Sequence, residues 1–163
     1  MDQQLVVFEL AEEHYGVDIG AVQSIIKMEQ VTVVPRAPDF VEGVINLRGT
    51  VLPVIDLRLR FGLSAKETTK DTRIAVVEID STEVGMVVDG VSEVLMVSDE
   101  DIEPPSPVVT TVDSAFITGI AKVAAAGGEG TNGRLIILLD LTKVLSAEEQ
   151  GALQELQDDA VGD

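Results

Sequence analysis

Carboxylates at the ends of aliphatic runs are the residues of this sequence that could most directly perform acid–base chemistry. They are Asp56, Asp89, Glu93 and Asp140. Two carboxylates that converge can serve as general acid and general base. The sequence does not show that any two of them converge, and solvated acids at strand ends explain the same pattern. A small β-barrel enzyme or ligand-binding domain that uses these acids therefore stays open as an alternative.

Other catalytic arrangements lack the residues that they need. His14 is the single histidine, cysteine is absent, and no Gly-x-Ser-x-Gly segment presents a nucleophilic serine. The glycine-rich segment 127–133 lacks the Lys-Ser/Thr pair of a phosphate-binding loop and carries Glu129 where a phosphate would approach. We therefore expect no catalytic residue, no metal and no cofactor.

The charge balance restricts the partners. The net charge is −18, from 29 acidic and 11 basic residues. Binding to DNA, RNA or an anionic lipid surface requires a basic patch, and the basic residues here form no cluster. No uncharged apolar stretch approaches the roughly 18 residues of a membrane span, and the first residues lack the basic segment of a signal peptide. These features predict a cytoplasmic protein with no nucleic-acid partner and no direct membrane insertion.

Short β-strands must position these residues. Most apolar runs are β-branched and bounded by Gly, Pro, Asp or Ser, which favours strands over helices. A short helix or irregular turn is expected where Ile19, Val22, Ile25 and Ile26 recur at helical spacing. A capping box, Ser146 to Glu149, predicts a C-terminal helix. The fold class is therefore mainly β, as two small barrels that share a core. The expected strands lie at residues 5–10, 15–17, 32–34, two within 43–58, then 73–79, 84–88, 91–97, 116–123 and 134–140.

Arg48 is the most unusual residue of the strand-rich part of the sequence. The segment 43–58 consists of two aliphatic runs joined by a tight Arg48-Gly49 turn, so that a single cation projects from an apolar hairpin. A solvated turn cation, an internal salt bridge and a contact with a partner are all compatible with this position.

Six separated motifs follow one another along the chain: Val6–Leu10, Tyr15–Ile19, Phe40–Gly49, Pro53–Arg58, Val87–Val94 and Leu135–Asp140. In this order they resemble the CheW family of chemotaxis coupling proteins. The resemblance covers about residues 4 to 150 and implies a pair of five-stranded SH3-like barrels packed together, with short helices. We expect one CheW-like domain over 1–157, with a seam near 64–71, an N-terminal strand shared by the barrels, and a disordered acidic tail at 158–163.

The resemblance implies a non-catalytic adaptor that links the cytoplasmic tips of chemoreceptors to the regulatory domain of the histidine kinase CheA. It also implies recruitment to membrane-associated receptor arrays and ring-like assembly with CheA. A detached regulatory domain of CheA and a fragment of a CheV-type adaptor are alternatives within the same class. The start at Met1, directly before the first expected strand, favours an independent protein.

The resemblance also implies which residues contact partners. Arg48 matches the arginine of the family motif, Val22, Ile74 and Val94 match apolar positions of the receptor-facing groove, and Gly43 and Gly119 match turn glycines beside it. Burial in a barrel core is the alternative for the three apolar residues. The family commonly has a glutamate where this sequence has Ser24, so the usual internal partner of the arginine is missing. Glu29 and Glu42 are the substitutes that the sequence offers.

The acid excess leads to a prediction about salt. If the charge is an adaptation to a high-salt cytoplasm, repulsion among the 29 acids destabilises the fold at low ionic strength and is screened as salt is added. The unfolding midpoint, followed by circular dichroism, should rise from low to molar KCl. A midpoint that does not rise would rule the adaptation out.

Overall fold

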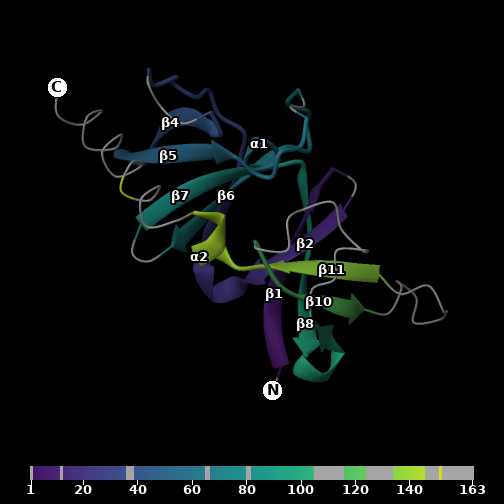
Figure 1. The fold of residues 1–163 in the computed structure, drawn as a ribbon. Coiled ribbons are helices and arrows are strands. Elements are labelled where there is room, and N and C mark those ends of the chain that lie inside the picture. The colour runs from purple at the N-terminus through teal and green to yellow at the C-terminus, as the bar shows by residue number, and fades with distance from the viewer. Residues whose placement is uncertain are drawn as a thin grey trace.

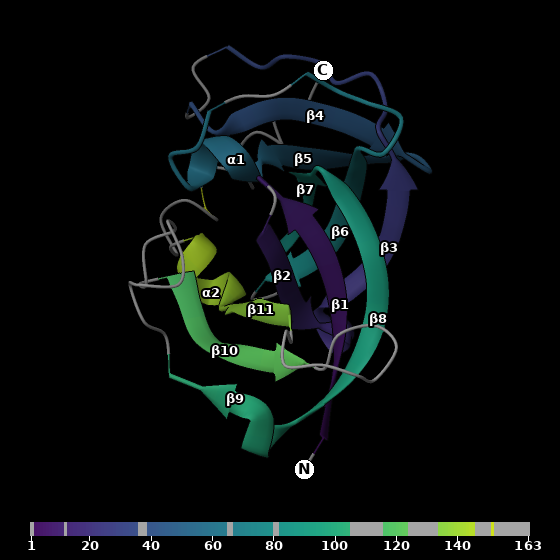
Figure 2. The same cartoon turned by 90° about the vertical axis from the view of Figure 1, so that its right-hand side faces the viewer.

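Two β-sheets make up nearly all of the regular structure (Figure 1). The computed structural model describes residues 2–11, 13–35, 39–64, 67–79, 82–104, 116–123, 134–145 and 151. The fold class is mainly β, as the strand pattern of the sequence predicted, and it is consistent with the SH3-like fold that the resemblance implied. Figure 2 shows the same arrangement after a quarter turn, with β4 and β5 at the top of the view and β9 and β10 at the bottom.

The five-stranded sheet has the strand order β3-β6-β7-β5-β4, and the six-stranded sheet has the order β8-β1-β2-β11-β10-β9. The first comprises β3 (Val22–Lys27), β6 (Arg73–Ile79), β7 (Thr82–Val88), β5 (Thr50–Asp56) and β4 (Val41–Leu47). The second comprises β8 (Gly90–Ser98), β1 (Asp2–Leu10), β2 (Glu13–Asp18), β11 (Arg134–Leu139), β10 (Ile117–Val123) and β9 (Ile102–Glu103). The helical turns are η1 (Ile19–Ala21), α1 (Leu57–Arg60), η2 (Asp99–Asp101) and α2 (Leu141–Val144).

A central core joins the two sheets, and each sheet also has an inner cluster of its own. Successive side chains of a strand point to opposite faces. In β1, therefore, Leu5 and Val7 enter the inner cluster of the six-stranded sheet, while Val6 and Phe8 enter the central core. Burial on both faces explains why these strands read as continuous apolar runs. The central core contains Val6, Phe8, Leu10, Tyr15, Val17, Ile55, Leu57, Phe61, Ala75, Val77, Ile79, Val84, Met86, Val88, Ile117, Ile137, Leu139, Val144 and Leu145.

Arg60 also connects the two sheets. Its guanidinium carbon lies 5.0 Å from the ring centroid of Phe40 and 5.2 Å from that of Phe116. Its Nε donates a hydrogen bond of 2.6 Å to the carbonyl oxygen of Val144. A partly buried guanidinium between two aromatic faces is a favourable cation–π arrangement. Arg60 therefore ties α1 of the five-stranded sheet to α2 of the six-stranded sheet.

Two local expectations differ from the structure. Only Ile19–Ala21 is helical, and Val22, Ile25 and Ile26 belong to β3. The reason is tertiary, because β3 pairs with β6 and its side chains alternate between half-buried and exposed. The segment 32–34 makes an isolated bridge, from Thr32 to Val44, rather than a strand. The expected C-terminal helix lies almost entirely outside the described residues.

The segment expected at the seam connects α1 to β6, and the strands before and after it pair within the five-stranded sheet. The chain passes from one sheet to the other between Asp18 and Val22 and between Val88 and Gly90. Strand pairing thus divides the chain differently from the linear order of residues. The division into subdomains at 64–71, and the acidic tail at 158–163, stay predictions.

The order of elements repeats once along the chain. The first half has the hairpin β1–β2, then β3, the hairpin β4–β5 and α1; the second has the hairpin β6–β7, then β8, the hairpin β10–β11 and α2. Each leading hairpin pairs with the other half. β1 pairs with β8 and β2 runs parallel to β11, while β6 pairs with β3 and β7 runs parallel to β5. Each sheet therefore contains strands from both halves of the chain.

This exchange of hairpins predicts the behaviour of a split chain. Fragments 1–67 and 68–163 each lack strands that complete their sheets, so neither should unfold cooperatively as a monomer. Co-expressed, they should form a 1:1 complex with the circular dichroism spectrum of the intact chain. Its Tm should be lower than that of the intact protein, because association becomes bimolecular. A folded monomer of either fragment in sedimentation experiments would contradict the prediction.

Candidate protein-interaction site

Arg48 projects from the two-residue turn between β4 and β5. Leu47 pairs with Thr50, and the turn residues Arg48 and Gly49 have φ angles of +53° and +85°. A positive φ at both positions is the pattern of a type I′ hairpin turn, which favours asparagine rather than arginine at the first position. The Oδ1 atom of Asn46 accepts a 2.9 Å hydrogen bond from the Gly49 N–H. The turn therefore holds an exposed arginine in a backbone conformation that costs free energy.

A pocket of about 210 Å³ lies beside Arg48. Ser24 lines this pocket together with Arg48, which confirms that the two positions are close. Glu83 is the carboxylate among the lining residues, so neither Glu29 nor Glu42 replaces the missing glutamate. Within the part of the chain that the structure describes, no ion pair involves Arg48. The remaining lining residues are Gln23, Leu47, Thr50, Leu52 and Val76.

The three apolar candidates lie in different environments. Ile74 is fully buried and packs in the inner cluster of the five-stranded sheet. Its side chain offers no surface to a partner, so the alternative interpretation, burial in the core, holds for this residue. Val22 is half-buried against the central core, and Val94 is 51% exposed. Of the three, Val94 presents the most surface.

Gly43 and Gly119 occupy equivalent irregularities in the two hairpins. Each lies where the register shifts, in β4 opposite Val54 and in β10 opposite Leu138. A Cβ at Gly43 would lie 2.1 Å from the carbonyl oxygen of Thr32, and one at Gly119 would lie 2.9 Å from that of Glu103. Both glycines therefore allow a neighbouring chain segment to approach closely.

The central core continues outward as exposed apolar residues along the edge strands β8 and β3. Val94 pairs with Val6, and Ile25 with Ala75. Paired residues share a face, and Val6 and Ala75 face the central core. We name this outward continuation the apolar edge. Two of its side chains, Val94 and Met96, are more than half exposed. Its members are Val22, Ile25 (37% exposed), Val94 (51%) and Met96 (62%). Figure 2 shows β3 and β8 on the same side of the view.

Sequence reasoning found only two members of the apolar edge. The sequence pattern places Ile25 in a helical repeat and Met96 within a strand, without marking either as a contact residue. Met96 could have been identified because side chains two residues apart in a strand lie on the same face, and Met96 follows Val94 by two residues. The identity of the edge strands, however, follows only from strand order.

Arg58 draws two of the strand-end acids together. It donates to both carboxylate oxygens of Asp89, at 2.9 Å and 2.6 Å, and this hydrogen bonding raises the pKa of Arg58 while burial opposes the shift. Asp89 also accepts from the Ala11 N–H, and Asp56 caps α1 through the Arg58 N–H. Asp140 lies in the other sheet and caps α2. Asp56, Asp89 and Asp140 thus each accept a hydrogen bond from a backbone N–H group and stabilise the local fold.

Glu42 lies near Asp56 in a small acidic pocket that Arg58 also lines. Burial raises the pKa of the Glu42 carboxyl, and the Asp56 carboxylate raises it further by charge repulsion and a side-chain hydrogen bond. Within the described residues, no group of three or more His, Cys, Asp or Glu side chains could hold a metal ion. Likewise, no helix in those residues is long and apolar enough to cross a membrane.

Two SH3-like sheets around one core, with an exposed apolar edge and a projecting arginine, define a small β-protein of the scaffold type. A family model for the CheW-like domain matches residues 4–149. The chain therefore belongs to the CheW family of chemotaxis proteins.

Known members of the family resemble the chain over most of its length. The chemotaxis protein CheW of Klebsiella aerogenes is 38% identical over 154 residues, which cover 94% of this chain and 88% of that protein. The CheW protein of Rhizobium meliloti is 37% identical over 150 residues, covering 92% of each. The crystal structure of the scaffolding protein TtCheW from Thermoanaerobacter tengcongensis matches with a TM-score of 0.77 and 44% identity, covering 91% of each chain.

The raised pKa of Glu42 predicts a pH-dependent effect of its substitution. Above the raised pKa, the charged Glu42 carboxylate destabilises the folded protein. This destabilisation is lost as the pH falls through the raised pKa, and it is gone below the ordinary value of 4.5, where Glu42 is protonated in both the folded and the unfolded state. Glu42→Gln should therefore raise Tm at pH 7, and the gain should disappear below the ordinary value. The control is Glu29→Gln, at an exposed position, which should change Tm little. A gain that persists at low pH would contradict this account.

Proposed function

We propose that this chain is a non-catalytic adaptor that couples chemoreceptors to the histidine kinase CheA. The observation that carries the proposal is the apolar edge. An exposed apolar strip that continues a protein core and has polar surroundings marks a protein-interaction surface. Its residues lie on two different sheets, so a partner that binds there contacts both sheets, and its affinity depends on their relative position.

The receptor is the partner that the apolar edge fits best. The family's receptors present helical hairpin tips, and a helix binds an apolar groove through side chains spaced along one face. Val94 and Met96 supply exposed side chains from the six-stranded sheet, and the exposed Ile25 and half-buried Val22 supply those from the five-stranded sheet. Receptor binding would bring the adaptor to membrane-associated arrays from the cytoplasmic side.

Arg48 provides a contact of a different kind. It is exposed on the β4–β5 turn, it shares a pocket with Gln23 and Ser24 of β3 beside the apolar edge, and it belongs to a protein with net charge −18. A cation at the rim of an interface sets specificity and association rate more than affinity. We assign this contact to CheA, whose regulatory domain resembles this fold, and two such contacts per adaptor would allow ring-like assembly. An adaptor couples the two partners only through contacts that differ between the signalling states of the kinase.

Arg48 gives a direct test of the proposal. Arg48→Glu should leave the circular dichroism spectrum unchanged and should weaken retention of CheA by roughly tenfold, or about 1.4 kcal/mol. Arg48→Asn should weaken retention less, and it should stabilise the fold by about 1 kcal/mol, because asparagine tolerates the left-handed conformation. Lys70→Glu, the same charge change at an exposed lysine, is the control and should bind normally.

Pull-down with CheA and with a receptor signalling fragment separates the possible outcomes. Val94→Glu should reduce retention of the receptor fragment while retention of CheA persists. Failure of the unmodified chain to retain either partner would overturn the proposed function. Unfolding of Arg48→Glu would instead assign Arg48 to the architecture of the hairpin.

A further inference from the structure

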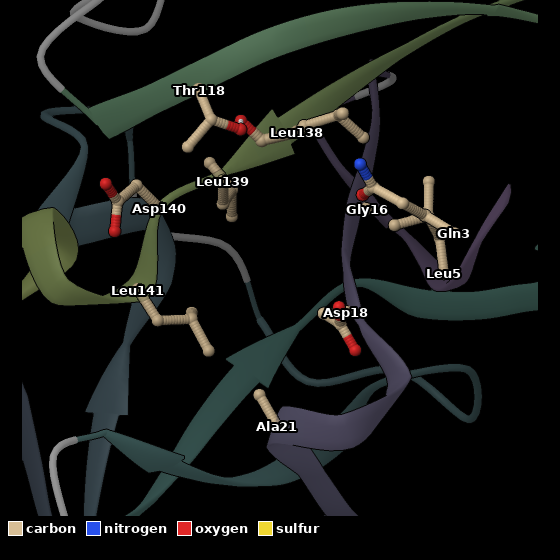
Figure 3. A pocket seen from close by; sticks show the side chains of 10 residues that line it. All are labelled: Gln3, Leu5, Gly16, Asp18, Ala21, Thr118, Leu138, Leu139, Asp140 and Leu141. Atoms are coloured by element: carbon tan, nitrogen blue, oxygen red, sulfur yellow. Dashed lines mark hydrogen bonds between the residues drawn. The ribbon is translucent and has the colours of Figure 1, made fainter. Parts of the chain in front are cut away.

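A second pocket, of about 330 Å³, opens where the parallel strands β2 and β11 end (Figure 3). Its walls are apolar and its rim carries two carboxylates, Asp18 and Asp140, which lie on opposite sides of the view in Figure 3 with Leu139 and Leu141 between them. The full lining is Gln3, Leu5, Gly16, Asp18, Ala21, Thr118, Leu138, Leu139, Asp140 and Leu141.

The repeat of elements provides an equivalent of this pocket in the five-stranded sheet. Gly16 pairs with Leu138 as Gly85 pairs with Val54. Asp140 follows β11 and caps α2 as Asp56 ends β5 and caps α1. Four residues of this lining have counterparts at the equivalent strand positions of the five-stranded sheet, and all four counterparts line the small acidic pocket around Arg58. The pairs are Gln3 and Thr72, Asp18 and Val87, Thr118 and Glu42, and Asp140 and Asp56.

In the five-stranded sheet an arginine fills the equivalent space. Arg58, two residues after Asp56, binds Asp89 through two hydrogen bonds and the Ser64 carbonyl oxygen through a third. The side chains of Arg58 and Asp89 are each 15% exposed. The remaining pocket has a volume of only about 30 Å³. The Arg58 side chain thus pairs with Asp89 and fills the space at the ends of these parallel strands.

In the six-stranded sheet Thr142 stands at the place of Arg58, two residues after Asp140, and the space stays open. Asp18 accepts the Gly20 N–H and Asp140 accepts the Thr142 N–H, each through Oδ1. Among the described residues, no hydrogen bond or ion pair uses the Oδ2 atom of either aspartate. The lining contains no lysine or arginine. The pocket therefore has two carboxylates, apolar walls and no cation.

We propose that this pocket receives an arginine side chain of a partner protein. The guanidinium lies at the carboxylate of Asp18, which accepts the N–H of Gly20, the residue at the place of Asp89 in the repeat. The aliphatic stem packs on Leu139 and Leu141, and Asp140 on the other side of the pocket adds attraction for the cation. Arginine fits better than lysine because its planar fork can bind carboxylates through paired hydrogen bonds. The proposal is independent of which protein supplies the arginine, so it does not rest on the adaptor function.

The chemistry can be tested with a small probe on the full chain. Nα-acetyl-arginine N-methylamide represents an arginine within a polypeptide, and its citrulline analogue has the same shape without the charge. In two-dimensional NMR of the ¹⁵N-labelled protein, the arginine probe should shift the amide signals of Gly16, Gly20 and Thr142, with a Kd on the order of 1 mM. The citrulline probe should bind at least tenfold more weakly.

Three variants connect the binding to the pocket. Thr142→Arg supplies the missing guanidinium from within, so it should raise Tm and abolish probe binding. Thr142→Ser, the matched control, leaves the space open and keeps the hydroxyl that donates to Asp140, so it should bind the probe as the unmodified chain does. Asp18→Asn keeps the cap of η1 but removes one charge, and it should weaken the probe at least fivefold. This variant also serves if Thr142→Arg does not fold.

Three results would overturn the proposal. The first is the absence of shifts at these amides at about 10 mM probe, ten times the expected Kd. The second is equal binding of the citrulline probe, which would show that charge has no part. The third is tighter binding of free arginine than of the blocked probe, which would assign the pocket to a small molecule rather than to a protein.

Discussion

The central core between the two sheets is the constraint on which the rest of the structure depends. Because each half of the chain gives a hairpin to the other half's sheet, neither sheet can bury its strands without the other. Arg60, held between Phe40 and Phe116, adds a polar tie across the same junction. The relative position of the sheets is therefore fixed by the packing that stabilises them, and the surfaces along their junction are fixed as well.

The candidate interaction sites follow from where this core ends. The apolar edge is the part of the core that neither sheet covers, since β3 and β8 are edge strands. The pocket at Asp18 and Asp140 lies where two parallel strands end, and its lining contains no arginine. Arg48, in contrast, belongs to a turn whose conformation disfavours arginine. Strain retained at an exposed residue is typical of a functional position.

Sequence reasoning located the strands and the hairpins β4–β5, β6–β7 and β10–β11, but not the order of the strands in each sheet. The runs that became β1, β6, β7 and β8 were recognisable from β-branched composition and bounding turns. The seam at 64–71 was inferred from its polar composition, which reports exposure but not sheet membership. Ile74 looked like a groove residue by resemblance and is buried, because its strand lies inside the sheet rather than at its edge.

The sequence by itself determined the fold class, the family and the position of the Arg48 turn, since these depend on local patterns of apolar residues, glycines and prolines. Only the tertiary structure decided which strands are edges, that Ser24 and Arg48 share a pocket, and that Asp89 and Asp56 gather at Arg58 while Asp18 and Asp140 have no arginine. The physical reason is that strand order brings together residues far apart in the chain. Periodicity along a strand carries no information about that order.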